Sequence, residues 1–174
     1  MARMRLLLIV VTVLLISWLV LGLSASAWAE TLNYKYYMWM AKREAIPVND
    51  VEGHIMSFYV RSSIYVFDNG EVATGVHTGT SDLINGSGSL MQYVTITFAD
   101  GSTIIMKSQG MLGDVVKGMY TASGLKSEII AGTGRFKGIT GTQVAKAKYL
   151  ATEKGELGPK GHGEGAITYT LPSK

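Results

Sequence analysis

The sequence predicts an all-β protein: a single eight-stranded antiparallel up-and-down β-barrel that follows an N-terminal signal segment. Apolar and polar residues alternate with a period of two in eight segments. Turns rich in glycine separate most of them, and the chain has 21 glycines but only 3 prolines. After residue 30 no segment keeps a helical period over three turns. A sheet without covering helices removes its edge strands by closing, which favours a barrel over the alternative, a two-sheet sandwich.

Residues 1–29 are predicted to be a signal peptide. Arg3 and Arg5 precede an uncharged apolar run, residues 6–23, and Ala27-Trp28-Ala29 has the small–x–small pattern of a cleavage site. The remaining domain, residues 30–174, would then be periplasmic or secreted. The alternative is a membrane anchor formed by residues 6–23, because a run of this length can just span a bilayer.

Charge and cysteine content argue against several functions. The formal net charge is +3, but without Arg3 and Arg5 only 14 basic residues face 13 acidic ones. The domain therefore has no basic stripe for a phosphate backbone, and we expect no nucleic-acid partner. The absence of cysteine excludes disulfides, thiolate metal sites and a cysteine nucleophile. Stability must come from the core and from closure of the sheet.

The first two strands are predicted at residues 31–40 and 51–67. Residues 41–50, which contain Pro47, are predicted to be a connection. In the second strand the even positions from Met56 to Val66 are almost all apolar, and the odd positions carry tyrosine, serine and arginine. Alternation does not say which side faces the interior, because a one-residue bulge exchanges the two.

The other strands follow turns with clear sequence signals. Asp68-Asn69-Gly70 and Asp100-Gly101 are predicted hairpin turns, because Asn and Gly adopt the required positive φ readily. Loops are predicted at 85–89, 112–118 and 154–161, and one short helical turn at 136–139. The six remaining predicted strands are 71–83, 90–99, 102–111, 119–131, 140–151 and 162–171.

A glycine-rich element gives the most specific motif in the chain. Residues 131–141 read AGTGRFKGITG, in which Gly132, Gly134, Phe136 and Gly138 have the spacing Gly-x-Gly-x-Phe-x-Gly. In this element the chain resembles the allene oxide cyclase and dirigent proteins, and in layout it resembles them from residue 51 to residue 171. The stretches IPVNDVEGH and TFADGSTI also resemble those of exported bacterial proteins of this barrel type.

The resemblance implies an eight-stranded barrel with any pocket in its interior. The plant enzymes of the superfamily bind apolar or phenolic substrates there and direct a cyclisation or a radical coupling. Their functional residues do not map onto this sequence, so catalytic residues stay unassigned, and a fold alone does not determine a function.

No cofactor and no metal ion is predicted. The glycine spacing is neither that of a dinucleotide fingerprint nor that of a phosphate loop, so a barrel corner is the preferred interpretation. His162 and Glu164 share one side of a strand, but nothing fixes the distance from them to His77. Ser87 lies between glycines in a predicted loop without the strand–helix context of a reactive serine.

The barrel interior is the predicted site for a small apolar or aromatic ligand. Polar side chains among aromatic ones on the strands would line it, and Glu128 would be the acid or base if the protein were a cyclase or isomerase. These side chains would instead face solvent if the strand faces were exchanged, and a filled barrel would be a structural or interaction protein. A homo-oligomer formed through residues 34–39 also stays open. The predicted ligand-binding residues are Tyr59, Arg61, Tyr65, His77, Tyr93, Lys107 and Glu128.

Overall fold

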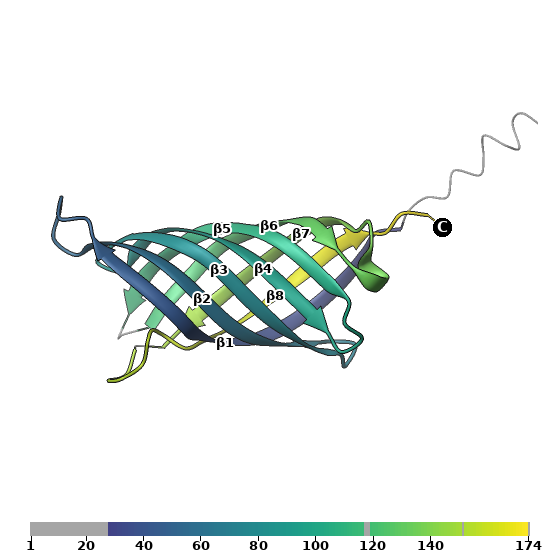
Figure 1. Cartoon of the computed structure of the whole chain (residues 1–174), viewed down its shortest axis with the longest axis horizontal. Helices are drawn as coiled ribbons and strands as arrows, with labels where there is room; N and C mark the ends of the chain where they lie inside the picture. Colours follow the sequence, from purple (N-terminus) through teal and green to yellow (C-terminus); the bar gives the residue numbers. More distant parts are fainter. Residues whose placement is uncertain (1–27, 117–118, 151, 174) are drawn as a thin grey trace, which may run out of the picture. The chain divides into compact units, whose positions relative to one another are not determined.

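A computed structural model describes residues 28–116, 119–150 and 152–173, and the side chains among them except those of 114–120. Residues 29–172 form one compact unit, a closed antiparallel barrel in which every strand pairs with its neighbours in chain order (Figure 1). The predicted fold class is therefore confirmed. The predicted signal peptide and membrane anchor lie almost wholly outside the described residues. No helix in the described part of the chain has the length and apolar character needed to cross a membrane.

The eight strands pair in sequence, and the last pairs with the first. The closing β1–β8 ladder runs from the Glu30–Tyr169 pair to the Met38–Gly161 pair. The strands are β1 Glu30–Pro47, β2 His54–Phe67, β3 Val72–Ile84, β4 Ser87–Phe98, β5 Thr103–Val116, β6 Met119–Gly132, β7 Thr140–Tyr149 and β8 Gly161–Thr170.

Three predicted connections are shorter than expected. The chain from residue 41 to Pro47 continues β1 after a bulge between Met40 and Lys42, and it pairs with β2 alone, because the β8 ladder ends at Met38. Proline is tolerated at such an edge, since its missing N–H has no partner strand to serve. Residues 112–116 likewise extend β5, and the loop at 85–89 is reduced to a two-residue turn before β4.

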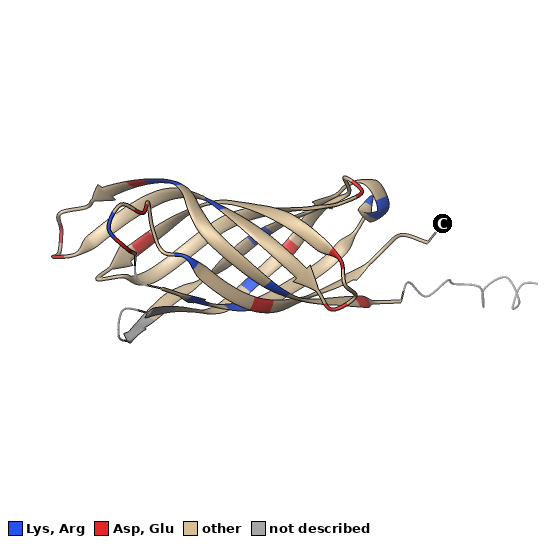
Figure 2. Cartoon of the chain, turned by 90° about the horizontal axis from the view of Figure 1, so that it is seen from below, with Lys and Arg blue, Asp and Glu red and all other residues tan. Residues whose placement is uncertain are grey.

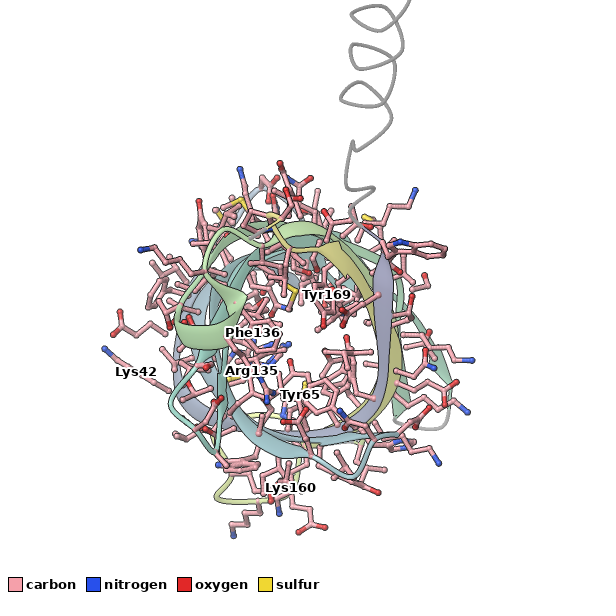
Figure 3. All side chains as sticks on the ribbon, turned by 90° about the vertical axis from the view of Figure 1, so that its right-hand side faces the viewer. Lys42, Tyr65, Arg135, Phe136, Lys160 and Tyr169 are labelled. Atoms are coloured by element: carbon pink, nitrogen blue, oxygen red, sulfur yellow. The ribbon has the colours of Figure 1, made fainter. Side chains whose placement is uncertain are left out.

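The glycine-rich element closes one end of the barrel. It holds a short 3-10 helix, η1, Gly134–Phe136, close to the predicted helical turn, and Gly134 and Gly138 have positive φ values of 59° and 78°. The buried Phe136 ring packs 4.9 Å from the Phe98 ring and 5.9 Å from the Tyr169 ring. Figure 3 looks at this end, where Phe136 and Tyr169 lie across the opening.

A salt-bridged arginine covers the same end. Arg135 contacts Glu71 at 2.6 Å and lies 3.7 Å from Asp100, and its guanidinium stacks over the rings of Phe98 and Phe136. Aromatic packing and a cation over the rings together stabilise this closure. The opposite end carries the 150–160 loop and the turns that join β1 to β2 and β3 to β4 (Figure 1).

A column of glycines on β8 makes room for large tyrosines inside the barrel. A β-carbon at Gly163 would lie 2.5 Å from the Tyr36 ring, and one at Gly165 would lie 2.5 Å from the Tyr34 hydroxyl. Gly161 faces the Tyr149 ring in the same way. The alternating glycines of β8 therefore allow three tyrosines to fill the interior without distorting the wall.

The polar side of β2 faces the interior, and its apolar side faces outward. Tyr59 and Tyr65 are buried, whereas Phe58 on the opposite side is 44% exposed. Outward positions on β3 and β4 are apolar, serine or threonine apart from Asp82, and long stretches of the ribbon carry no charged residue (Figure 2). We call this surface the β2–β4 face. Its large apolar side chains are Phe58, Ile64, Val66, Val76, Met91 and Tyr93.

Candidate functional site

The interior of the barrel holds a cluster of polar and aromatic side chains around β2. Successive inward positions of this strand are Tyr59, Arg61, Ser63 and Tyr65, and all four are buried. His77 on β3 lies beside Arg61 in the β2–β3 register. Because side chains alternate along a strand, one long strand delivers every second residue to the same interior wall.

His77 is fully enclosed by neighbouring hydroxyls and rings. Its Nε2 atom lies 2.9 Å from Ser63 Oγ and 3.1 Å from Tyr65 Oη, and the rings of His77 and Tyr65 are stacked 6.2 Å apart. Two hydroxyl donors at Nε2 favour the tautomer with its proton on Nδ1. The Nδ1 atom is buried and has no hydrogen-bond partner among the described residues. It is therefore a buried donor without an acceptor.

Burial keeps the His77 imidazole neutral. Loss of solvent, together with the nearby Arg61 charge, lowers the pKa of His77 to about 3. At neutral pH the ring is therefore uncharged, which is consistent with the two hydroxyls that donate to it. It cannot act as a cationic acid at that pH, but it can accept and donate hydrogen bonds.

Arg61 is the one buried cation among the described side chains. Its Nη1 atom donates a hydrogen bond of 3.1 Å to Tyr149 Oη, and its guanidinium carbon lies 4.2 Å from the centre of the Tyr59 ring and 5.0 Å from that of Tyr149. The Nε atom has no partner in the described part of the chain. The two tyrosine rings hold the guanidinium by cation–π contacts.

The neighbouring tyrosines are hydrogen-bonded and remain protonated. Tyr59 Oη donates to Gln92 Oε1 at 3.2 Å, and burial raises the pKa of Tyr59 to about 12. Burial also raises the pKa values of Tyr36 and Tyr65. These phenols can donate hydrogen bonds or a proton, but they do not ionise readily enough to act as bases near neutral pH.

A cavity of about 120 Å³ lies next to Arg61, at the end of the barrel opposite η1. Its walls come from β1, β2, β3, β5 and β7, with Gly86, Thr152 and Pro159 at the surrounding turns. The polar side chains at the cavity are Arg43, Tyr59, Arg61, Ser81 and Tyr149, and the large apolar ones are Met40, Leu83 and Leu112. The Phe98, Phe136 and Tyr169 rings pack at the other end of the barrel, so the cavity lies at the end without this aromatic packing.

The predicted site residues divide into two groups. Tyr59, Arg61, Tyr65 and His77 are buried together in the interior. Tyr93, Lys107 and Glu128 lie on the outer side of the wall, and Tyr93 is 46% exposed there. Even-numbered residues point inward on β4 and β5, as the burial of Gln92, Met106 and Ser108 shows, so the odd-numbered Tyr93 and Lys107 lie outside. On β6 the odd-numbered residues point inward, as the burial of Ser127 and Ile129 shows, so Glu128 lies outside.

Sequence reasoning missed several members of the interior cluster. Tyr149 contacts Arg61 from β7, and Ser63, Tyr36 and Gln92 complete the surroundings of His77 and Tyr59. Ser63 has the same parity on β2 as Tyr59 and Arg61, so that parity could have identified it. Tyr149 is 88 positions from Arg61, and only closure of the barrel brings the two together.

The fold and the interior define a closed eight-stranded β-barrel with a buried, tyrosine-rich polar cluster and a small cavity at one end. Two solved structures similar to the chain are the pterocarpan synthase dirigent proteins GePTS1 and PsPTS1. The first is 15% identical with a TM-score of 0.46, over 83% of this chain and 89% of the other. The second is 17% identical with a TM-score of 0.47, over 84% of this chain and 97% of the other. No protein-family model and no curated protein matches the chain.

Proposed function

We propose that this protein is exported and that its barrel binds a small apolar or aromatic molecule in the cavity beside Arg61. The observation that carries the proposal is the buried donor Arg61 Nε, which belongs to a residue lining the cavity and has no acceptor among the described residues. Buried polar atoms in folded proteins nearly always have a partner. A bound molecule with an acceptor atom in this cavity would give Arg61 Nε such a partner.

The walls of the cavity suit an apolar or aromatic body. Met40, Leu83 and Leu112 supply aliphatic surface, and the rings of Tyr59 and Tyr149 supply flat aromatic surface. A small site with mostly apolar walls and a few directed polar groups is typical of small-molecule binding.

A cyclase or isomerase is the second candidate, and Tyr59 favours it. This phenol borders the cavity, and its raised pKa keeps it protonated, so it could donate a proton or a hydrogen bond to a reacting oxygen. None of the described acidic side chains is buried, so no described carboxylate is available as its basic partner. Binding therefore ranks above catalysis.

The protein also has a surface suited to self-association. The β2–β4 face is apolar or hydroxyl-bearing and has no charge before Asp82, so two copies can pack there without burying a charge. Tyr37 and Trp39 of β1 are also exposed. We include a homo-oligomer in the proposal, with a second copy of the chain as the occupant of this face.

Native mass spectrometry of the full-length gene product tests the proposed ligand. We expect a stoichiometric extra mass of a small organic molecule, and an intact protein mass that begins at Glu30 if the signal peptide is removed. Ser81→Leu should fill the cavity and abolish the extra mass. The matched control is Thr80→Leu, which adds the same side chain on the outer face of the same strand.

Two results would count against binding. One is a protein without bound mass that also takes up nothing from a hydrophobic extract. The other is an equal loss of bound mass in the Ser81 and Thr80 variants, which would place the molecule outside the cavity. For the cyclase alternative, new products in an extract incubated with wild-type protein, but not with Tyr59→Phe, would be the expected result.

A further inference from the structure

Arg61 is a buried cation without an acidic partner among the described side chains. Its side chain is 4% exposed, and no described acidic side chain lies within salt-bridge distance of it. The side chains of residues 114–120 are outside the described set. Arginine does not lose its proton in proteins, so the guanidinium cannot become neutral to suit its surroundings.

The contacts of Arg61 satisfy only part of this group. A guanidinium has five N–H donors, and one hydrogen bond, to Tyr149, is formed within the described chain. The rings of Tyr59 and Tyr149 offset part of the charge, but they accept no conventional hydrogen bond. The Nε donor remains open. A buried cation in this state favours an anion that is also a hydrogen-bond acceptor.

A second arginine lies at the same cavity. Arg43 is half-buried on β1, and its Nε and Nη2 atoms lie 3.3 and 3.2 Å from Ser57 Oγ. Apart from Ser57, no described side chain accepts a hydrogen bond from the Arg43 guanidinium. Arg43 and Arg61 both line the cavity. Two guanidinium groups therefore give this end of the barrel interior a positive potential.

Building on the proposed function, we infer that the ligand is a small organic acid whose carboxylate pairs with Arg61. A carboxylate presents two acceptor atoms in a plane, which matches the forked donors of a guanidinium. The aliphatic and tyrosine walls then surround the apolar or aromatic body of the acid. Met40, Leu83 and Leu112 offer apolar surface that an organic acid can contact, whereas inorganic phosphate has no apolar atoms to place there.

Isothermal titration calorimetry with the purified full-length protein tests this inference. Benzoate is the probe, benzamide is its neutral counterpart of similar shape, and inorganic phosphate is the dianionic comparison. We expect benzoate to bind about tenfold or more tightly than benzamide or phosphate, because only benzoate combines a charge-assisted pair with an apolar ring that contacts the cavity walls. Benzoate binding should also be lost at a pH where its carboxyl group is protonated.

Variants of Arg61 separate charge from geometry. Arg61→Met should weaken benzoate binding by about tenfold or more, and Arg61→Lys should weaken it less, because it keeps the charge but not the fork. Arg61→Met replaces an unpaired buried cation with an apolar side chain, so it should fold; if it does not, Arg61→Lys carries the test. Lys126→Met is the matched control: it removes one positive charge from the outer wall and should leave binding unchanged.

The outcomes distinguish this inference from the proposed function. Equal binding of benzamide and benzoate, or tighter binding of phosphate, would overturn the inference that the ligand is a carboxylate. The proposed function, a barrel that binds a small molecule, would still stand. Failure of every probe, together with no bound mass and no uptake from an extract, would overturn both.

Discussion

The Nε2 atom of His77 lies 2.9 Å from Ser63 Oγ, inside a barrel wall that excludes solvent from both groups. The ring is neutral because it is buried, and a proton added to Nε2 would place a positive charge in this enclosed interior. This pairing connects the interior cluster to the pH dependence of stability.

We predict that His77 makes the fold less stable as the pH falls. Its pKa is about 3 in the folded chain and near its ordinary value of 6.5 in the unfolded chain, because burial penalises the charged ring. The stability is fully present above pH 6.5 and falls toward pH 3, with a limiting slope of roughly 1.4 kcal/mol per pH unit. Urea unfolding of wild type and His77→Gln between pH 7 and pH 4 measures the difference.

His54 provides a control of opposite sign. The carboxylates of Asp82 and Asp50 accept hydrogen bonds from the partly buried His54 ring and raise its pKa, so its contribution is present at low pH and is lost as the pH rises. His54→Gln should therefore remove stability at low pH, the reverse of His77→Gln. The same pH dependence in wild type and His77→Gln would contradict the role assigned to His77.

We predict that one methyl group added to a glycine of the β8 column destabilises the fold. Gly163→Ala places a β-carbon against the Tyr36 ring and should destabilise the fold by about 1 to 3 kcal/mol through overpacking. Gly113→Ala is the matched control, because no described atom lies within 4 Å of its added carbon. Thermal or urea unfolding compares the two, and equal effects would show that the column does not determine the packing.

We predict that truncation of Phe136, the buried ring of η1, strongly lowers the free energy of unfolding. Phe136→Ala removes the ring that packs between Phe98 and Tyr169, and it should cost about 3 to 5 kcal/mol of unfolding free energy. Leu157→Ala, at a residue 58% exposed, should change it by less than about 0.5 kcal/mol. Equilibrium unfolding in urea measures both, and a small effect at Phe136 would mean that the end is not closed by this ring.

We predict that two copies of the protein associate through the β2–β4 face, and that one charged residue placed on this face disrupts the association. Val76→Lys places a cation at an exposed apolar position of this face, and sedimentation velocity should show a shift to the monomer. Val144→Lys makes the same change at an exposed position of β7 and should leave the assembly intact. A wild-type monomer at all concentrations would contradict self-association.

The sequence was enough to predict the eight strands, their order and the turns at Gly70 and Gly101, because alternation and turn chemistry are local. It was not enough to assign the inside of β2, where the apolar positions Ile64 and Val66 face outward and Tyr65 faces inward. That choice depends on register: the interior accepts large tyrosines because glycines lie opposite them on another strand.

The interior cluster could be predicted in part. Tyr59, Arg61, Tyr65 and His77 are close along the chain or on adjacent strands, so parity alone grouped them. Arg61 and Tyr149 come from β2 and β7, and their contact follows from barrel closure and strand tilt. The full length of β1 was not predicted because Pro47 normally signals the end of a strand. Here the last part of β1 pairs with β2 alone, and a proline without an N–H is tolerated in such an edge segment.

The pairing of β1 with β8 brings Glu30 and Tyr169 together, although they are 139 positions apart, and the Tyr169 hydroxyl donates a 2.5 Å hydrogen bond to the Glu30 carboxylate. The two ends of the folded domain are therefore neighbours in space. A short peptide linking them, with the chain reopened at the Asp100-Gly101 turn, would give a circular permutant that keeps every strand pairing. In such a chain the last ladder to form would join β4 to β5, so the order of assembly could be changed without changing the barrel.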